Sequence, residues 1–176
     1  MRGWAYANLL NYYCDPMDAL TKPMDEMLSI PVYTETEIKN GALGAPRVTI
    51  AEVYSRVYED LSTAIEILDA YGELNQRASK LEVDADVARV MLAYAMLNHG
   101  NPDIIIVGED SQNPKNAYQI ALEMAEAAIT NGKYPMLKKA ELTTTGFADV
   151  TAPNWMWGQD VTVETTTALA SFFGQV

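Results

Sequence analysis

The segment 113–135, NPKNAYQIALEMAEAAITNGKYP, constrains the fold most, because it has the pattern of a helix whose packing face is mostly alanine. Asn113 as N-cap, Pro114 at the first helical position and Gly132 after the last turn predict its two ends. Its inward positions are Ala117, Ile120, Ala121, Met124, Ala125 and Ala128. Small side chains let two helix axes approach to the short end of the usual ~8–10 Å separation, so we expect this helix to stack closely on a neighbouring helix.

The clearest of the other helices is predicted over 49–71. Thr49 and Glu52 form a capping box at its start, apolar residues follow at helical spacing, and Gly72 is expected to end it. At about 1.5 Å per residue such a helix is too long to pack against one short neighbour only.

Two further helices are predicted, over 3–14 and 84–99. The first is apolar and aromatic on most sides, which suits a helix buried among neighbours. The second is capped by Asp84, and its apolar stripe consists of Val87, Val90, Met91, Tyr94 and Leu97. The apolar run at 104–107 that follows is too short for a helix and predicts a strand-like insertion.

The helices are expected to form two antiparallel pairs, 3–14 with 49–71 and 84–99 with 114–131. Small residues at fixed steps, followed by Pro135, resemble the second helix of a tetratricopeptide repeat. The connections within the pairs are much longer than that repeat allows, so the pairs carry long decorated loops. The fold class is therefore predicted to be mainly α, with residues 136–176 forming a less regular, partly β-like end.

Charge and cysteine content exclude several functions. The net charge is −12, and a phosphate backbone is bound by surfaces rich in Lys and Arg, so we expect no nucleic-acid binding. The same charge disfavours a basic helix lying on a membrane, and no apolar run approaches the ~18 residues that would cross one. A single cysteine permits no internal disulfide and no cysteine-based metal cluster.

Five segments, in their order and spacing, resemble the SusD/RagB-like outer-membrane nutrient-binding lipoproteins. They are SIPVYTE after the aromatic first helix, RVTIAEVYSRVYEDLSTAIEILD, ADVARVMLAYAMLNHGN, NAYQIALEMAEAAITNGKYPM and PNWMWGQDVTVET. The run IIIVGEDSQNP departs from the family, in which many members have a shorter or different loop. The resemblance implies that residues 1–176 are one helical domain fragment of the SusD-like α/α superhelix.

The resemblance also implies a function. It predicts a bacterial cell-surface lipoprotein that binds a nutrient, expected to be a glycan or oligosaccharide, and delivers it to a SusC-type TonB-dependent transporter of the outer membrane. Such proteins have no catalytic centre, and we expect no cofactor. Family members are longer than this chain, so we expect the signal peptide, the lipid anchor and most of the sugar-contacting loops to lie outside it. The repeat helices are then expected to form a scaffold and a surface that faces the transporter.

The residues that could carry catalytic or metal chemistry form no recognisable constellation. His99 lies at the end of a predicted helix, where a cation or polar cap is the ordinary role. Cys14 has no neighbouring base in the sequence and is expected to be a buried structural thiol. The acidic residues between 103 and 110 lack the regular spacing of a calcium loop, so we expect an ordinary loop and no metal.

Trp155 and Trp157 are the best candidates for contacting a sugar, and Tyr33 is a third. Aromatic rings pack on the flat C–H faces of sugars, while a few placed polar groups bind the hydroxyls. In a strand-like segment, residues two apart lie on the same face, and a core contact is the commoner role for such a pair. Both roles stay open for these residues.

Two alternative functions also stay open. A tetratricopeptide-type adaptor without sugar binding would hold a peptide through Asn, Lys and Arg on its inner helices. The helix over 84–99 offers only Arg89 and Asn98 for that purpose. A hydrolase would need two carboxylates that converge in a pocket at the ~5–10 Å separations used by glycosidases.

Overall fold

The computed structural model describes residues 1–14, 27–41, 44–74, 77–99, 105–106, 115–143 and 150–158. Its main helices are α1 (Arg2–Tyr13), α3 (Ile50–Leu74), α4 (Ala85–Leu97) and α5 (Ala117–Thr130). Two shorter helices are α2 (Glu35–Lys39) and α6 (Lys139–Leu142). The predicted mainly α fold is therefore confirmed.

The described strands are short and form two antiparallel pairs. β1 (Leu28–Pro31) pairs with β2 (Arg47–Thr49), with Leu28 opposite Thr49 and Pro31 opposite Arg47. β3 (Ile105–Ile106) pairs with β4 (Lys115–Asn116), which confirms the predicted strand-like insertion for these two residues. Each pair closes a connection between successive helices.

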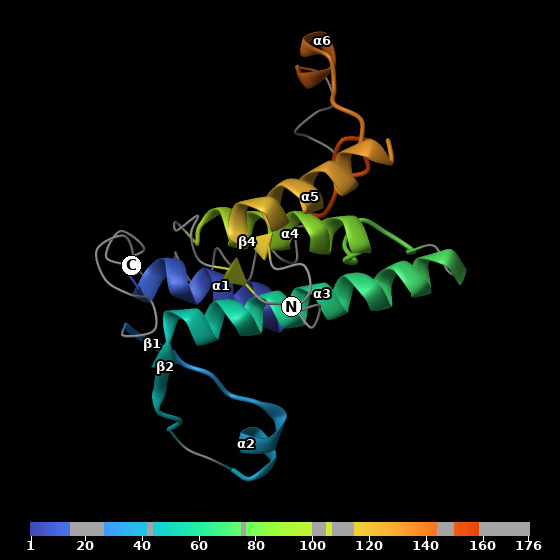
Figure 1. The fold of residues 1–176 in the computed structure, drawn as a ribbon. Helices are drawn as coiled ribbons and strands as arrows, with labels where there is room; N and C mark the ends of the chain where they lie inside the picture. The colour runs from blue at the N-terminus through green and yellow to red at the C-terminus, as the bar shows by residue number, and fades with distance from the viewer. Residues whose placement is uncertain are drawn as a thin grey trace, which may run out of the picture.

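The long helices form a stack (Figure 1). α4 lies between α3 and α5, and α1 lies along α3 on the same side as α4. The loop that carries α2 projects from the opposite side of α3, and α6 stands away from the stack beyond α5. The core is the region where α1, α3 and α4 meet, and its fully buried residues include Val53, Val57, Leu61, Leu92 and Met96.

The predicted role of the alanine face is confirmed. Ala117, Ala121 and Ala128 of α5 are buried, as are Ala88 and Ala95 of α4. α4 and α5 lie side by side (Figure 1). Buried small side chains thus occur on both helices of this close pair, which permits their axes to approach.

α1 approaches α3 through a glycine. A Cβ atom added to Gly3 would lie 2.9 Å from the Cβ of Asp60 and 3.2 Å from the carbonyl oxygen of Val57. Both distances are shorter than ordinary contacts, so glycine permits this approach. The outer end of α1 differs from the prediction, because Tyr12 and Tyr13 are largely exposed and only the face with Tyr6 and Leu10 is buried.

Two predicted helix ends are wrong. α5 begins at Ala117, because Asn116 and Gln119 form a reciprocal capping box with two hydrogen bonds of 2.9 Å. Asn113 and Pro114 lie outside the described residues. α3 continues through Gly72 to Leu74, since Gly72 keeps a helical conformation there.

Other predicted caps are confirmed. Asp84 caps α4 by accepting the N–H of Val87, and Thr49 and Glu52 bond to each other at the start of α3. Gly132 follows α5 with a φ of 67°, the left-handed conformation that commonly ends a helix.

Candidate ligand-binding groove

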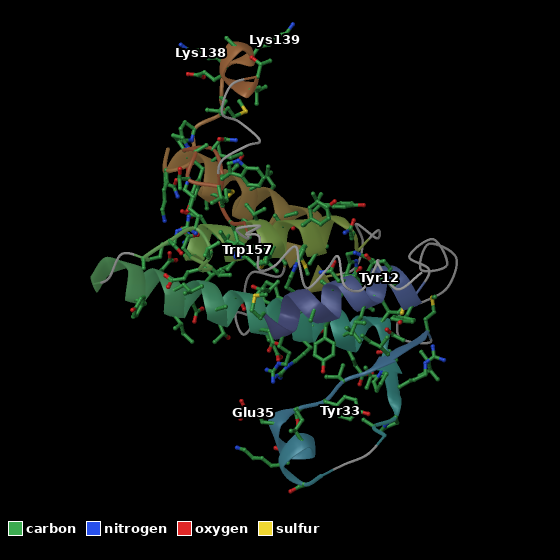
Figure 2. The ribbon with its side chains drawn as sticks, turned by 180° about the vertical axis from the view of Figure 1, so that it is seen from behind. Tyr12, Tyr33, Glu35, Lys138, Lys139 and Trp157 are labelled. Atoms are coloured by element: carbon green, nitrogen blue, oxygen red, sulfur yellow. The ribbon has the colours of Figure 1, made fainter. Side chains whose placement is uncertain are left out.

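An apolar groove of about 430 Å³ opens on the surface where α1, α4 and the segment 150–158 meet. We call it the aromatic groove. It is lined by Trp4, Asn8, Val87, Val90, Met91, Tyr94, Met156 and Trp157. Figure 2 shows Trp157 beside α4.

Helical periodicity places the groove residues. Trp4 and Asn8 are one turn apart on α1, and the contributions of α4 follow the same rule. The sequence pattern predicted one apolar stripe on α4, but the stripe has two environments. Val87 and Met91 are buried, whereas Val90 and Tyr94 are exposed by 39% and 58%. Val90 and Tyr94 therefore present exposed surface to the groove.

The aromatic rings around the groove are held in defined positions. Trp4 and Tyr94 meet edge to face, with ring centroids 6.2 Å apart and an interplanar angle of 71°. The indole Nε1–H of Trp157 donates to the carbonyl oxygen of Leu81 at 3.1 Å. The polar edge of that ring is thus engaged with the backbone, while 36% of the residue stays exposed. Flat apolar ring surfaces of this kind suit the C–H faces of a sugar.

The Trp157 segment is fixed to the loop 77–83 by bonds to the backbone. The ammonium of Lys80 donates to the carbonyl oxygens of Ala152 and of Thr151, the latter at 3.3 Å. The N–H of Gly158 donates to the carbonyl oxygen of Lys80 at 3.1 Å. We call this contact between 77–83 and 150–158 the loop seam. It determines where Trp157 lies relative to α4.

Residues 150–158 form turns, so the expectation of a strand-like segment is wrong here. The N–H of Trp155 donates to the carbonyl oxygen of Ala152, and the loop seam fixes the rest of the segment. Trp155 is half-buried beside Gly158, and the groove is lined by Met156 and Trp157 without it. The two tryptophans therefore do not share the groove.

Tyr33 lies elsewhere, in the loop that carries α2 (Figure 2). Its N–H donates to the hydroxyl of Tyr6 at 2.8 Å, and its own hydroxyl accepts the N–H of Ala45 at 3.1 Å. These bonds tie the two arms of that loop together and to α1. The structure does not bring Tyr33 to the aromatic groove.

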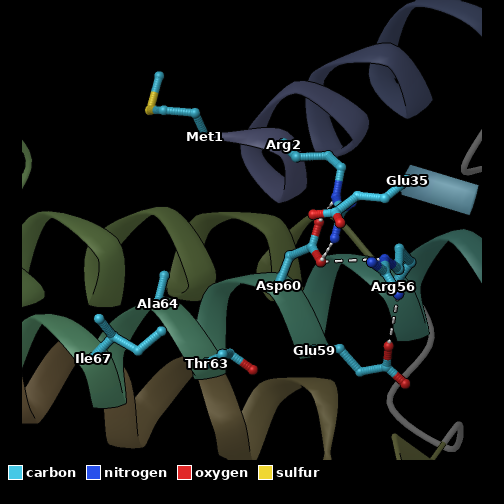
Figure 3. A pocket seen from close by; sticks show the side chains of 9 residues that line it. All are labelled: Met1, Arg2, Glu35, Arg56, Glu59, Asp60, Thr63, Ala64 and Ile67. Atoms are coloured by element: carbon cyan, nitrogen blue, oxygen red, sulfur yellow. Dashed lines mark hydrogen bonds and ion pairs between the residues drawn. The ribbon is translucent and has the colours of Figure 1, made fainter. Parts of the chain in front are cut away.

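A charged cleft of about 510 Å³ between α1 and α3 is a weaker candidate (Figure 3). The guanidinium of Arg2 donates twice to Asp60, at 2.7 Å each, and Arg56 lies 3.1 Å from Asp60 and 3.4 Å from Glu59. The hydrogen bond to Asp60 is the main cause of the raised pKa of Arg2. Its charges are paired across the two helices, and no aromatic ring lines it among the described residues, so it lacks the flat apolar surface that the aromatic groove offers.

The buried histidine and the cysteine have structural surroundings. His99 follows α4 and packs against the ring of Tyr54, with centroids 4.3 Å apart. Burial raises the pKa of Tyr54, whose hydroxyl donates to the carbonyl oxygen of Asn98 at 3.1 Å. The sulfur of Cys14 lies 3.0 Å from the hydroxyl of Ser29.

Two kinds of feature are absent from the residues that the structure describes. No group of three or more His, Cys, Asp or Glu residues is placed to hold a metal ion among the residues that the structure describes. No helix within those residues has the length and apolar character needed to cross a bilayer.

Sequence reasoning found Trp157 by its residue type and missed Trp4, Tyr94 and Met156. The sequence does contain a signal for Tyr94. The apolar stripe on α4 is flanked by alanines, and these alanines already account for one contact with a neighbouring helix. A second apolar face on the same helix indicates a second neighbour or a ligand. Met156 carries no comparable signal, since its place depends on the loop seam.

A family model described as SusD-like, starch-binding and associating with outer membrane, matches residues 1–92, which is more than half of the chain. The crystal structure of a SusD-like carbohydrate binding protein from Bacteroides vulgatus ATCC 8482, at 1.70 Å resolution, is similar to this fold with a TM-score of 0.67 and 22% sequence identity. The similarity covers 93% of this chain and 29% of that protein. No curated protein matches the chain.

Proposed function

The chain belongs to the SusD-like family, described as starch-binding and associating with outer membrane, and we propose that it captures glycans at the bacterial cell surface. In this proposal a lipid anchor outside the chain keeps the protein at the outer membrane. The captured glycan passes to a SusC-type TonB-dependent transporter. The protein binds its ligand without transforming it.

The exposed aromatic faces of the groove are the observation that supports this proposal. Trp157 and Tyr94 border an apolar groove together with Trp4, and their exposed surface has no role in the described core. The solved protein of similar fold is named as a carbohydrate binding protein. Sugar rings offer the complementary surface, because their C–H faces are apolar and their edges carry hydroxyls.

The groove also carries a polar group suited to a hydroxyl. The amide of Asn8 donates one N–H to the carbonyl oxygen of Trp4 at 2.8 Å. An amide has a second N–H and an acceptor oxygen, so it can bind a sugar hydroxyl without losing that bond. A few polar groups in a mostly apolar hollow are the usual composition of a small-molecule site.

Affinity electrophoresis and calorimetry against plant, host and microbial glycans test the proposal. We expect retention by at least one neutral glycan, and a loss of about tenfold or more in affinity in Trp157→Ala, which corresponds to ~1.4 kcal/mol. Tyr118→Ala is the matched control, since Tyr118 is an exposed aromatic of α5 that does not line the groove. If the wild-type chain binds no glycan, or if both variants bind equally well, the groove is not the capture site.

No specific observation favours the adaptor alternative. The guanidinium of Arg89 donates to Asp86 at 2.8 Å and also to Asp69. The carbonyl oxygen of Asn98 accepts the hydroxyl of Tyr54. The cation that a peptide carboxylate would need is thus already paired.

A further inference from the structure

A second and larger hollow, of about 780 Å³, lies between the end of α3, the loop 77–83 and the end of α5. We call it the polar basin. The residues that carry the inference are Tyr71, Arg77, Glu82, Asp84, Lys133 and Tyr134. The sequence pattern identifies Asp84 as a helix cap and indicates none of the six as a binding residue.

The polar groups of the basin are held in fixed positions around Asp84. Its carboxylate accepts the hydroxyl of Tyr134 and the ammonium of Lys133, each at 2.5 Å. The guanidinium of Arg77 donates to the hydroxyl oxygen of Tyr134 at 2.6 Å and to the carbonyl oxygen of Glu82 at 2.9 Å. A ligand would therefore meet hydrogen-bonding groups that are already ordered.

The balance of charge in the basin indicates which ligands it suits. Arg77 and Lys133 both lie within ion-pair distance of Asp84, so the cations are compensated and do not present a free positive surface. An anionic ligand would have to compete with Asp84 for them. Sugar hydroxyls need no net charge, because each can donate to a carboxylate and accept from an ammonium. Lys133 is about half-exposed and remains reachable.

An aromatic ring at the edge of the basin adds an apolar surface. Tyr71, on the last turns of α3, is exposed by 57% and lines the hollow. Lys133 and Glu82 line the same hollow, so a pyranose packed on this ring would share it with those polar groups. Aromatic surface beside ordered polar groups is the combination that a sugar subsite needs.

The basin and the aromatic groove share a wall. The loop seam contributes Pro153 and Lys80 to the basin, and Met156 and Trp157 to the groove. At the start of α4, the N-cap Asp84 lines the basin and Val87 lines the groove. One extended chain molecule can thus contact both hollows by crossing the loop seam.

We propose that the polar basin is a second subsite, which takes a neutral pyranose residue of the same glycan chain that packs on Trp157. This inference rests on the proposed function of glycan capture. It predicts that the protein selects for chain length, because only a longer oligosaccharide reaches both hollows. It also predicts a preference for neutral over anionic sugars in the basin.

A chain-length series tests the inference on the 176-residue chain. The probes are neutral oligomers of two to seven residues from α-glucan, xylan and mannan, with oligogalacturonates as the anionic counterpart. We expect Tyr71→Ala to lower the affinity for the longest neutral oligomer by about tenfold and to leave the affinity for the dimer unchanged. Trp157→Ala should lower the affinity for both lengths.

A second variant separates hydroxyl binding from ring packing. Lys133→Met keeps the aliphatic stem and removes the ammonium, and we expect the same dependence on chain length with a smaller loss. Circular dichroism checks that each variant is folded, and Tyr118→Ala is the surface control.

The outcomes separate the two proposals. If Trp157→Ala weakens binding while Tyr71→Ala and Lys133→Met bind every length as the wild type does, the second subsite is wrong and glycan capture stands. If oligogalacturonates bind more tightly than the neutral series and Lys133→Met abolishes this, the assigned ligand class is wrong. If no oligomer of any length binds the wild type, both the subsite and the proposed capture function fail.

Discussion

The contact between α4 and α5 and the loop seam position different parts of the molecule by different means. Between the helices, buried alanines recur at helical spacing on both partners, which permits close packing. At the loop seam, Lys80 and Leu81 bind the backbone and indole of residues more than 70 positions later. The first contact uses many small apolar groups, and the second uses a few hydrogen bonds.

In this fold, stability and ligand binding depend on different contacts. A net hydrogen bond contributes about 0.5–1.5 kcal/mol, so the few bonds of the loop seam are weak beside a packed helix interface. The loop seam nevertheless positions Trp157, which the helix interface does not touch. We therefore expect substitutions in the helix contact to change stability and substitutions in the loop seam to change binding.

Ala121→Leu should have the largest effect on stability. Ala121 is buried in the α4–α5 contact, and a leucine there would push the two helices apart. Overpacking of this kind costs about 1–3 kcal/mol, and we expect the upper end because both faces are lined by small residues. Urea unfolding of the variant measures it. Ala70→Leu, at an exposed position of α3, is the matched control and should unfold like the wild type. If Ala121→Leu and Ala70→Leu were destabilised equally, the contact between α4 and α5 would not be tightly packed.

Asp84→Ala should have the next largest effect, because Asp84 joins the loop 77–83 to both helices of the contact. It caps α4 and binds Lys133 and Tyr134 at the end of α5. Loss of a cap costs about 1 kcal/mol, and the lost ionic hydrogen bonds should bring the total to about 2 kcal/mol. Asp84→Asn keeps an acceptor for the cap, so it should recover roughly half of the loss in urea unfolding.

The same residue predicts a pH dependence. Burial raises the pKa of Asp84, but hydrogen bonds from Lys133, Tyr134 and Val87, with the charge of Arg77, outweigh it and hold the pKa below its ordinary value. A carboxyl whose pKa is lower in the folded state stabilises the fold above the unfolded pKa of about 3.9. That contribution disappears as the pH falls through the folded pKa. The stability difference between wild type and Asp84→Asn should thus be full at pH 6 and shrink as the pH falls below about 3.9 through the folded pKa; a constant difference would contradict the assignment.

The sequence predicts the helix contact well because the signal is local. Alanines three and four residues apart, the cap at Asp84 and the glycine at 132 are all recognised from residues within one or two turns. The start of α5 was mispredicted because an Asn-Pro pair and an Asn-x-x-Gln pair compete as helix starts. The tertiary structure uses the second, since Lys115 and Asn116 pair with β3.

The groove was predictable only in part because its geometry is not local. Trp157 was identified by residue type, but its place depends on a bond to Leu81, 76 positions earlier in the chain. No periodicity links such residues. The sequence pattern placed Tyr94 in an apolar stripe expected to pack against another helix. A sequence alone does not say which neighbour a helix face contacts. The polar basin was missed for the same reason, as its groups come from α3, α5 and a loop.

Lys80→Met should have the smallest effect on stability and a clear effect on binding. The substitution removes the bonds to Ala152 and Thr151, while the aliphatic stem can still cover the loop. We expect a loss below about 1 kcal/mol in urea unfolding, because two neutral acceptors return to water.

Binding should respond more strongly to Lys80→Met than stability does, because the indole of Trp157 loses its fixed position. The side chain of Trp157 would then have to be ordered when the glycan binds. That ordering costs roughly 0.5–1.5 kcal/mol and lowers the glycan affinity by up to about tenfold. Quenching of tryptophan fluorescence by iodide should increase in Lys80→Met, and most of the increase should be absent in Lys80→Met combined with Trp157→Phe. If Lys80→Met shows the same quenching and the same glycan affinity as the wild type, Trp157 is positioned by its own packing on α4. The difference between the helix contact and the loop seam would then apply to stability alone.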